Sequence, residues 1–115
     1  MHELSLAGDI LRMVEAAGVR ERFRRVAQLR LEAGALACIE PQALRFALAA
    51  MAPGTCLEGA DITIAEALGT AWCPSCAAEV EIASRVEPCP QCASFPLHAT
   101  GGTELRVLDL MVFDD

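Results

Sequence analysis

The sequence predicts an α+β protein: a small mixed β-sheet with two helices, into which a metal-binding module is inserted. Three observations carry this prediction. Two segments have the apolar spacing of amphipathic helices, three have the pattern of strands, and four cysteines in two CxxC pairs lie between the last two strands. With 115 residues, 54% of them hydrophobic, the chain has the size of one small domain carrying a metal-stapled subdomain.

The first two elements follow from their periodicity. Residues 4–17 are predicted to form a helix, and Gly18 is placed to end it. Residues 25–33 are predicted to form a strand, because apolar residues alternate there with Gln28, Arg30 and Glu32. The helix buries one stripe, made of Leu6, Ile10, Met13, Val14 and Ala17.

The remaining elements are a helix and two strands around the cysteines. The helix begins near Glu40-Pro41 and stops at Pro53-Gly54. A strand is expected from residue 61 to about 68, a metal module over 72–97, a turn over 100–103 and a last strand over 104–113. The last strand is apolar on both faces, which predicts a central strand covered on both sides. We therefore expect an α/β domain from residues 1–70 and 101–115, and a metal module from residues 71–100.

The four paired cysteines predict a structural zinc site. Cys73 and Cys76, and Cys89 and Cys92, each flank two spacer residues, which lets both sulfurs of a pair reach one ion. A redox dithiol would need one CxxC at a helix start rather than two facing pairs. Alanines 77 and 93 follow the second cysteine of each pair, where glycine is often found, so the backbone there must avoid positive φ or accept strain.

The chain begins Met1-His2-Glu3, a combination that can bind metal. The α-amine, one peptide nitrogen and the imidazole can surround an ion in one plane, with Glu3 supplying a fourth donor through its backbone nitrogen or carboxylate. Planar nitrogen coordination suits Ni(II) and Cu(II) rather than Zn(II) or Mg(II). The alternative from these residues alone is a solvated terminal histidine.

Charge and missing motifs exclude several function classes. The net charge is −7, and residues 71–115 carry two Arg against seven acidic residues, so this half would repel nucleic acid. No segment is apolar enough to span a membrane and the start lacks the pattern of a signal peptide, so we expect a cytoplasmic protein. No catalytic triad, P-loop or nucleotide fingerprint is found, so no enzyme activity is predicted.

Other reactive residues have weaker interpretations. Cys38 and Cys56 lack a partner at metal-ligand spacing and are predicted to be buried structural thiols. His98 follows Cys92 by six residues; it is a surface or turn histidine, or else a group near the metal or an alternative ligand. The arginine-rich run of residues 20–25 is expected to be a solvated loop rather than a phosphate site.

The sequence resembles the HypA family of nickel metallochaperones for [NiFe]-hydrogenase maturation, because several short segments and the paired cysteines occur in the order found in that family. The resemblance covers nearly the whole chain. It rests on the four cysteines and on residues 1–7 (MHELSLA), 30–36 (RLEAGAL), 39–46 (IEPQALRF) and 100–106 (TGGTELR).

The resemblance implies a specific function. It implies nickel bound by the Met1 amine and His2 with Glu3 beside them, and structural zinc at the cysteines. It further implies a GTPase partner of the HypB type and delivery to the hydrogenase large-subunit precursor, with urease as a further client in some members. We expect a monomer or weak homodimer. The competing hypothesis is a zinc-ribbon adaptor that binds protein or nucleic acid, with His2 incidental.

Overall fold

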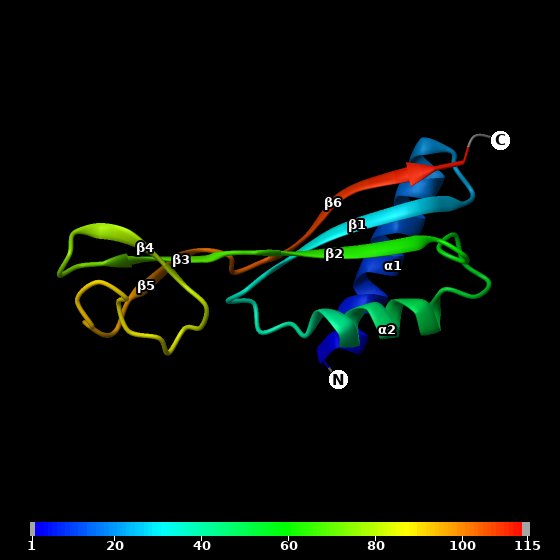
Figure 1. Ribbon diagram of the computed structural model, residues 1–115. Helices are drawn as coiled ribbons and strands as arrows, with labels where there is room; N and C mark the ends of the chain where they lie inside the picture. Colours follow the sequence, from blue (N-terminus) through cyan, green and yellow to red (C-terminus); the bar gives the residue numbers. More distant parts are fainter. Residues whose placement is uncertain (1, 114–115) are drawn as a thin grey trace. The chain divides into compact units, whose positions relative to one another are not determined.

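The computed structural model describes residues 2–113 and contains two helices and six strands in that range. In chain order these are α1 (His2–Glu21), β1 (Val26–Gly34), α2 (Pro41–Met51), β2 (Asp61–Ala67), β3 (Gly69–Cys73), β4 (Ala78–Ile82), β5 (His98–Gly101) and β6 (Leu105–Val112) (Figure 1). The strands form two three-stranded sheets, ordered β2-β1-β6 and β4-β3-β5. The α+β fold class and the insertion of the cysteine-rich segment between two strands of one sheet are confirmed.

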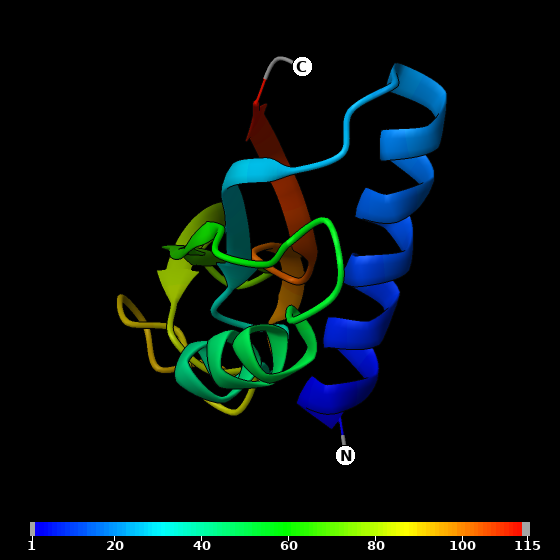
Figure 2. The ribbon, with the colours of Figure 1, turned by 90° about the vertical axis from the view of Figure 1, so that its right-hand side faces the viewer.

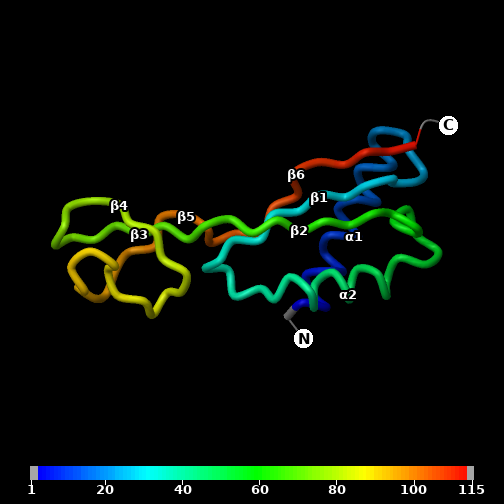
Figure 3. Tube along the Cα trace, viewed as in Figure 1, coloured from blue at the N-terminus to red at the C-terminus, as the bar shows by residue number. Residues whose placement is uncertain are grey.

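The described chain packs as two compact units. The first comprises residues 1–31, 40–64 and 107–115, and the second residues 32–39 and 65–106. The strands β1, β2 and β6 contribute residues to both units, and the chain passes from β2 to β3 with only Leu68 between them (Figure 3). The domain division expected from the sequence, residues 1–70 and 101–115 with a metal module over 71–100, is based on the position of the metal ligands and not on packing. It stays a prediction.

The first unit is built on contact between α1 and α2 (Figure 2). Glu40 caps α2: its side chain accepts a hydrogen bond from the Ala43 amide, and Pro41 occupies the first turn. The predicted positions of β1, α2 and β2 are therefore confirmed within one or two residues. The core of this unit includes Ala7, Ile10, Val14, Val26, Leu29, Leu31, Leu44, Ala47 and Leu48.

The helix α1 continues past Gly18, so the prediction that this glycine ends it is wrong. Arg22 takes a left-handed conformation with φ 63°, and the Phe23 amide donates to the Gly18 carbonyl at 3.0 Å. This six-to-one hydrogen bond is that of the Schellman motif: Gly18, in the last turn of α1, provides the acceptor carbonyl, and the left-handed Arg22 directly follows the helix. Position 18 has little room for a side chain because Phe23 packs against it: a Cβ there would lie 3.0 Å from the Phe23 carbonyl oxygen.

The strand β6 lies at a sheet edge, which corrects the prediction of a central strand. The order β2-β1-β6 places β1 in the centre, and no residue of β6 is fully buried. Met111 is 59% exposed and Phe113, just beyond the strand, is 56% exposed. An apolar pattern on both faces predicts a covered strand, but the pairing partners are set by residues elsewhere in the chain.

The second unit has a small core of its own. It contains Leu36, Ala71, Cys73, Val80, Ile82 and Cys89, with Cys76 and Leu97 packed against it. The expected turn over residues 100–103 is shorter than predicted, because Thr70 pairs with Gly101 and draws it into β5. Gly102 makes the turn with φ +71°, and a Cβ there would lie 2.4 Å from the Leu68 carbonyl oxygen, so only glycine fits.

Candidate metal centre

The four predicted cysteine ligands form one cluster. Their sulfur atoms all lie within 4.8 Å of one another, with Cys73 Sγ 3.6 Å from Cys92 Sγ and Cys76 Sγ 3.8 Å from Cys89 Sγ. A regular tetrahedron with metal–sulfur bonds of about 2.3 Å has edges of about 3.8 Å. The sulfurs are too far apart for disulfides, whose S–S bond is about 2.05 Å. The spacing is that of a closed tetrathiolate site.

The β3–β4 hairpin and a second tight loop position these sulfurs. Cys73 ends β3 opposite Ala78, so Cys76 lies in the hairpin turn. The second loop is closed by two backbone hydrogen bonds, from Cys89 to the Ser94 carbonyl at 2.9 Å and from Ala93 to the Cys89 carbonyl at 2.8 Å. In each loop an amide donates to the first sulfur at 3.4 Å: Cys76 to Cys73, and Gln91 to Cys89.

The alanine that follows each cysteine pair has a strained backbone. The sequence alone had left it open whether these alanines avoid positive φ or accept the strain. Ala77 has φ 51° and Ala93 has φ 63°. Only glycine adopts such values at no steric cost. Of the two alternatives, avoiding positive φ or accepting strain, the chain accepts the strain at both positions.

Two of the four thiols, those of Cys76 and Cys92, have pKa values shifted in opposite directions. Hydrogen bonds to the Ser94 side chain and backbone lower the pKa of the Cys92 thiol to about 6; Ser94 Oγ lies 3.2 Å from the sulfur. Hydrogen bonding with Cys92 and then burial raise the pKa of Cys76 to about 12. A bound cation would favour the thiolate form of the sulfurs that hold it.

At the N-terminal end, the structure describes part of the predicted nickel set. The Met1 amine and the His2 imidazole lie outside the described atoms. The backbone of α1 begins at His2, and Glu3 Oε2 accepts a hydrogen bond from the Glu40 amide at 3.4 Å. The position of Glu40 before Pro41 predicts a helix start, but sequence reasoning missed its hydrogen bond with Glu3, because no local signal marks a contact between residues 37 positions apart.

The other predicted residues have mixed outcomes. Cys38 is exposed with φ 59°, so its prediction as a buried thiol is wrong: it lies in the turn that follows β1. Cys56 is half-buried. Burial raises the pKa of the Cys56 thiol, and the Glu15 carboxylate raises it further. His98 is exposed at the start of β5 and is not part of the four-cysteine cluster, the one group of three or more ligand-type side chains found among the described residues.

Comparison with known proteins identifies the family. The family model described as "Hydrogenase/urease nickel incorporation, metallochaperone, hypA" matches residues 1–112. The hydrogenase maturation factor HypA of Cupriavidus necator is 59% identical over 114 residues, which is 99% of this chain and 96% of that protein. The HypA of Polaromonas naphthalenivorans is 54% identical over all of both chains.

Solved structures share the fold. The solution structure of the Ni metallochaperone HypA from Helicobacter pylori aligns with a TM-score of 0.69 at 16% identity, covering 98% of each chain. A second solution structure of a HypA protein gives a TM-score of 0.63 at 18% identity, covering 98% of this chain and 97% of that one. No helix within residues 2–113 is long and apolar enough to cross a membrane.

These matches extend over nearly the whole chain and include the N-terminal segment and the four paired cysteines. The family consists of metallochaperones and maturation factors, which confirms that no enzyme activity is expected. The resemblance read from the N-terminus, the two CxxC pairs and the TGG-x-ELR segment is likewise confirmed: this chain belongs to the HypA family of metallochaperones for nickel incorporation into hydrogenase or urease.

Proposed function

We propose that this protein binds Ni(II) at its N-terminus and delivers it to the precursor of a [NiFe]-hydrogenase large subunit. The proposed ligands are the Met1 amine, a peptide nitrogen and the His2 imidazole, with Glu3 beside them. The observation that carries the proposal is the family match, which runs from residue 1 to residue 112 and so includes this terminus.

The local backbone supports nickel binding at this position. Because α1 begins at His2, the His2 and Glu3 amides are among the first four of the helix, which have no intrahelical acceptor. These nitrogens can therefore face an ion without breaking the helix. Planar nitrogen donors favour Ni(II), and a terminal location allows the ion to be released.

We further propose that the four cysteines hold Zn(II) as a structural ion. The sulfur–sulfur distances of 3.6 and 3.8 Å match a tetrahedral Zn–S site. The four sulfurs would fill all four positions of such a site, which leaves none for a substrate. In this proposal zinc stabilises the second unit, and nickel is the cargo of the N-terminus.

The proposed partners follow from the family. They are a GTPase of the HypB type and the hydrogenase precursor, with urease as a further possible client, and the proposed location is the cytoplasm. The expected assembly is a monomer or weak homodimer.

A nickel titration by calorimetry on untagged, zinc-loaded protein tests the nickel site. We expect near-stoichiometric binding by the wild type, loss of binding in His2→Ala, and weakened binding when two residues are added before Met1, because the α-amine ligand is then lost. His98→Ala is the matched control, since it removes the other histidine of the chain, and it should bind nickel normally.

Equal nickel binding by the wild type and His2→Ala would overturn the assignment. It would favour the alternative, a zinc-ribbon adaptor that tolerates extension of its N-terminus. Transfer is tested separately by incubating nickel-loaded protein with the hydrogenase precursor and measuring nickel in each after separation.

A further inference from the structure

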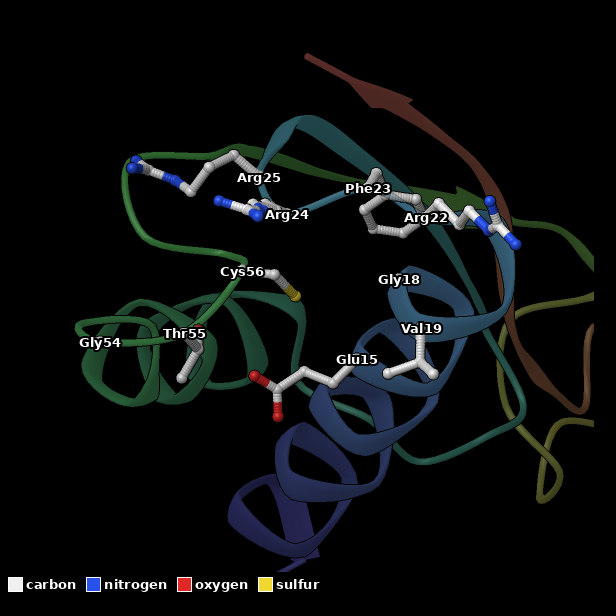
Figure 4. Close-up of a pocket in the computed structure, with 10 residues that line it drawn as sticks. All are labelled: Glu15, Gly18, Val19, Arg22, Phe23, Arg24, Arg25, Gly54, Thr55 and Cys56. Atoms are coloured by element: carbon white, nitrogen blue, oxygen red, sulfur yellow. The ribbon is translucent and has the colours of Figure 1, made fainter. Parts of the chain in front are cut away.

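A large open groove lies in the first unit, at the end of α1 opposite to His2, and its lining shares no residue with either proposed metal site. Its volume is about 1060 Å³, and its walls come from the end of α1, from residues 22–25 and from residues 54–56. Figure 4 shows Glu15 and Val19 on α1, Arg24 and Arg25 on the facing segment, and the Cys56 sulfur pointing into the space between them. Neither the zinc nor the nickel proposal uses these residues.

The groove is positively charged in a protein of net charge −7. Residues 20–25 hold four of the nine cationic residues of the chain, and three of these, Arg22, Arg24 and Arg25, line the groove. Arg22 extends away from Cys56, whereas Arg24 and Arg25 stand above it (Figure 4).

The carboxylates near the groove do not neutralise these arginines. Glu15 is the acidic residue in the lining. Glu58, next to the groove, accepts a hydrogen bond from the Gly54 amide at 2.6 Å. Arg25 donates to the Glu58 backbone carbonyl at 2.6 Å, which fixes its guanidinium without cancelling its charge. Arg24 makes no hydrogen bond or ion pair with any residue in the range 2–113.

The groove also has an apolar wall. Val19 is 84% exposed, and the Phe23 ring packs beside Gly18 at the end of α1. An exposed valine beside arginines whose charge no carboxylate within residues 2–113 neutralises indicates an occupant that carries both negative charge and apolar side chains. A nucleic acid has the charge without the apolar side chains, and the overall negative charge of the protein would repel such a long polyanion.

We propose that this groove binds an acidic, apolar segment of a partner protein, whose carboxylates pair with Arg24 and Arg25 and whose apolar side chain packs on Val19. Arginine suits this role because its planar guanidinium can donate two parallel hydrogen bonds to one carboxylate. The interaction does not depend on nickel, so it is separable from the proposed metal delivery.

The probe is a fluorescently labelled peptide in which Glu and Leu alternate. Its binding to the full-length, zinc-loaded, nickel-free protein is measured by fluorescence anisotropy. We expect binding that weakens with salt, because the attraction is between charges at the surface. Arg24→Gln with Arg25→Gln should weaken it at least about tenfold, since hydrogen bonds between charged groups contribute about 1.5–3 kcal/mol and tenfold is about 1.4 kcal/mol.

Matched variants identify the groove as the site. Arg20→Gln removes a cation of the same run that lies outside the groove and pairs with Glu21 at 3.7 Å, so affinity should stay within about twofold. Glu15→Gln removes the repelling carboxylate and should tighten binding. Arg24→Gln alone removes no hydrogen bond or ion pair within residues 2–113, so weaker binding by this variant would not be explained by loss of the fold.

A footprint locates the peptide independently. Saturating peptide should slow the modification of Cys56 by a maleimide, read by peptide mass mapping, while Cys38, exposed and outside the groove, reacts as before. Three results would each overturn the proposal. The Arg24/Arg25 double variant could bind the peptide as tightly as the wild type, or a Gln–Leu peptide could bind as tightly as the Glu–Leu peptide. Inorganic phosphate could also displace the peptide when it supplies the same concentration of negative charge as the peptide.

Discussion

Glu3 and Glu40, 37 residues apart in the chain, are joined by a hydrogen bond in which the Glu40 amide donates to Glu3 Oε2 at 3.4 Å. Glu3 lies in the first turn of α1, and Glu40 is the N-cap of α2. The bond ties the start of the chain to the start of the second helix. The residue next to the proposed nickel ligands is therefore anchored, although it lies near a chain end.

Removal of this anchor should loosen the terminus. We expect Glu3→Ala to lower the free energy of unfolding by about 1 kcal/mol, the usual contribution of one hydrogen bond, measured by urea unfolding. Glu3→Gln keeps an acceptor oxygen and should lose less. If the two variants are equally destabilised, the charge of Glu3 matters and its hydrogen bond does not.

Two glycines of α1 should respond to alanine in opposite directions. In Gly18→Ala the new Cβ would lie 3.0 Å from the Phe23 carbonyl oxygen and 3.3 Å from its ring, so we expect destabilisation despite the helix preference of alanine. Gly8→Ala is the matched control: its Cβ would meet nothing closer than 3.5 Å, so it should stabilise the protein by about 1 kcal/mol. Thermal unfolding of both variants, followed by circular dichroism, tests this difference.

The strained alanines after the cysteine pairs should be improved by glycine. Ala77 and Ala93 have φ values of 51° and 63°, where an L-residue is disfavoured by about 1–2 kcal/mol. We expect Ala77→Gly and Ala93→Gly to stabilise the second unit by up to about 1 kcal/mol, less than the full strain because glycine gains freedom on unfolding. If the glycine variants lose zinc to a chelator more slowly than the wild type, the expected stabilisation is present. Faster loss from the variants would contradict the strain argument.

Removal of the proposed zinc ion should unfold the second unit and spare the first. The single tryptophan, Trp72, precedes Cys73 on β3 and reports on this unit alone. We expect a chelator, or Cys73→Ser, to shift Trp72 emission to the red while the helical circular dichroism of α1 and α2 remains, because a small metal module takes much of its folding free energy from the ion. Cys38→Ser is the control and should change neither signal. Loss of both signals together would show that the units unfold as one.

The ion pair between β1 and β6 predicts a pH dependence. Arg30 Nε lies 2.8 Å from Asp109 Oδ1, and Arg30 Nη2 lies 2.7 Å from Oδ2. The hydrogen bonds from Arg30 hold the pKa of Asp109 below its ordinary value of 3.8. The unfolded state therefore takes up the proton more readily, so the stability from this pair is present above the ordinary pKa and is lost as pH falls through the lowered one.

An Asp109→Asn variant tests this pH dependence. It should unfold more easily than the wild type near neutral pH, and the difference in urea midpoint should vanish in acid. A difference that is independent of pH would instead point to packing.

The sequence by itself determined the elements whose signals are local. The alternation of residues 25–33, the Glu40-Pro41 helix start and the two CxxC pairs each depend on neighbours within a few residues, and each is found within one or two residues of where it was expected. The family was recognisable for the same reason, because its motifs are short and stand in order.

Only the tertiary structure decided the features that depend on distant partners. β6 is an edge strand because β1 takes the central place, and α1 passes Gly18 because Phe23 folds back on it. Cys38 is exposed because it lies in a tight turn, and the basic groove exists because residues 22–25, residues 54–56 and the end of α1 come together in space. Pairing and burial depend on which segments meet in space, and periodicity along one segment carries no information about its partner.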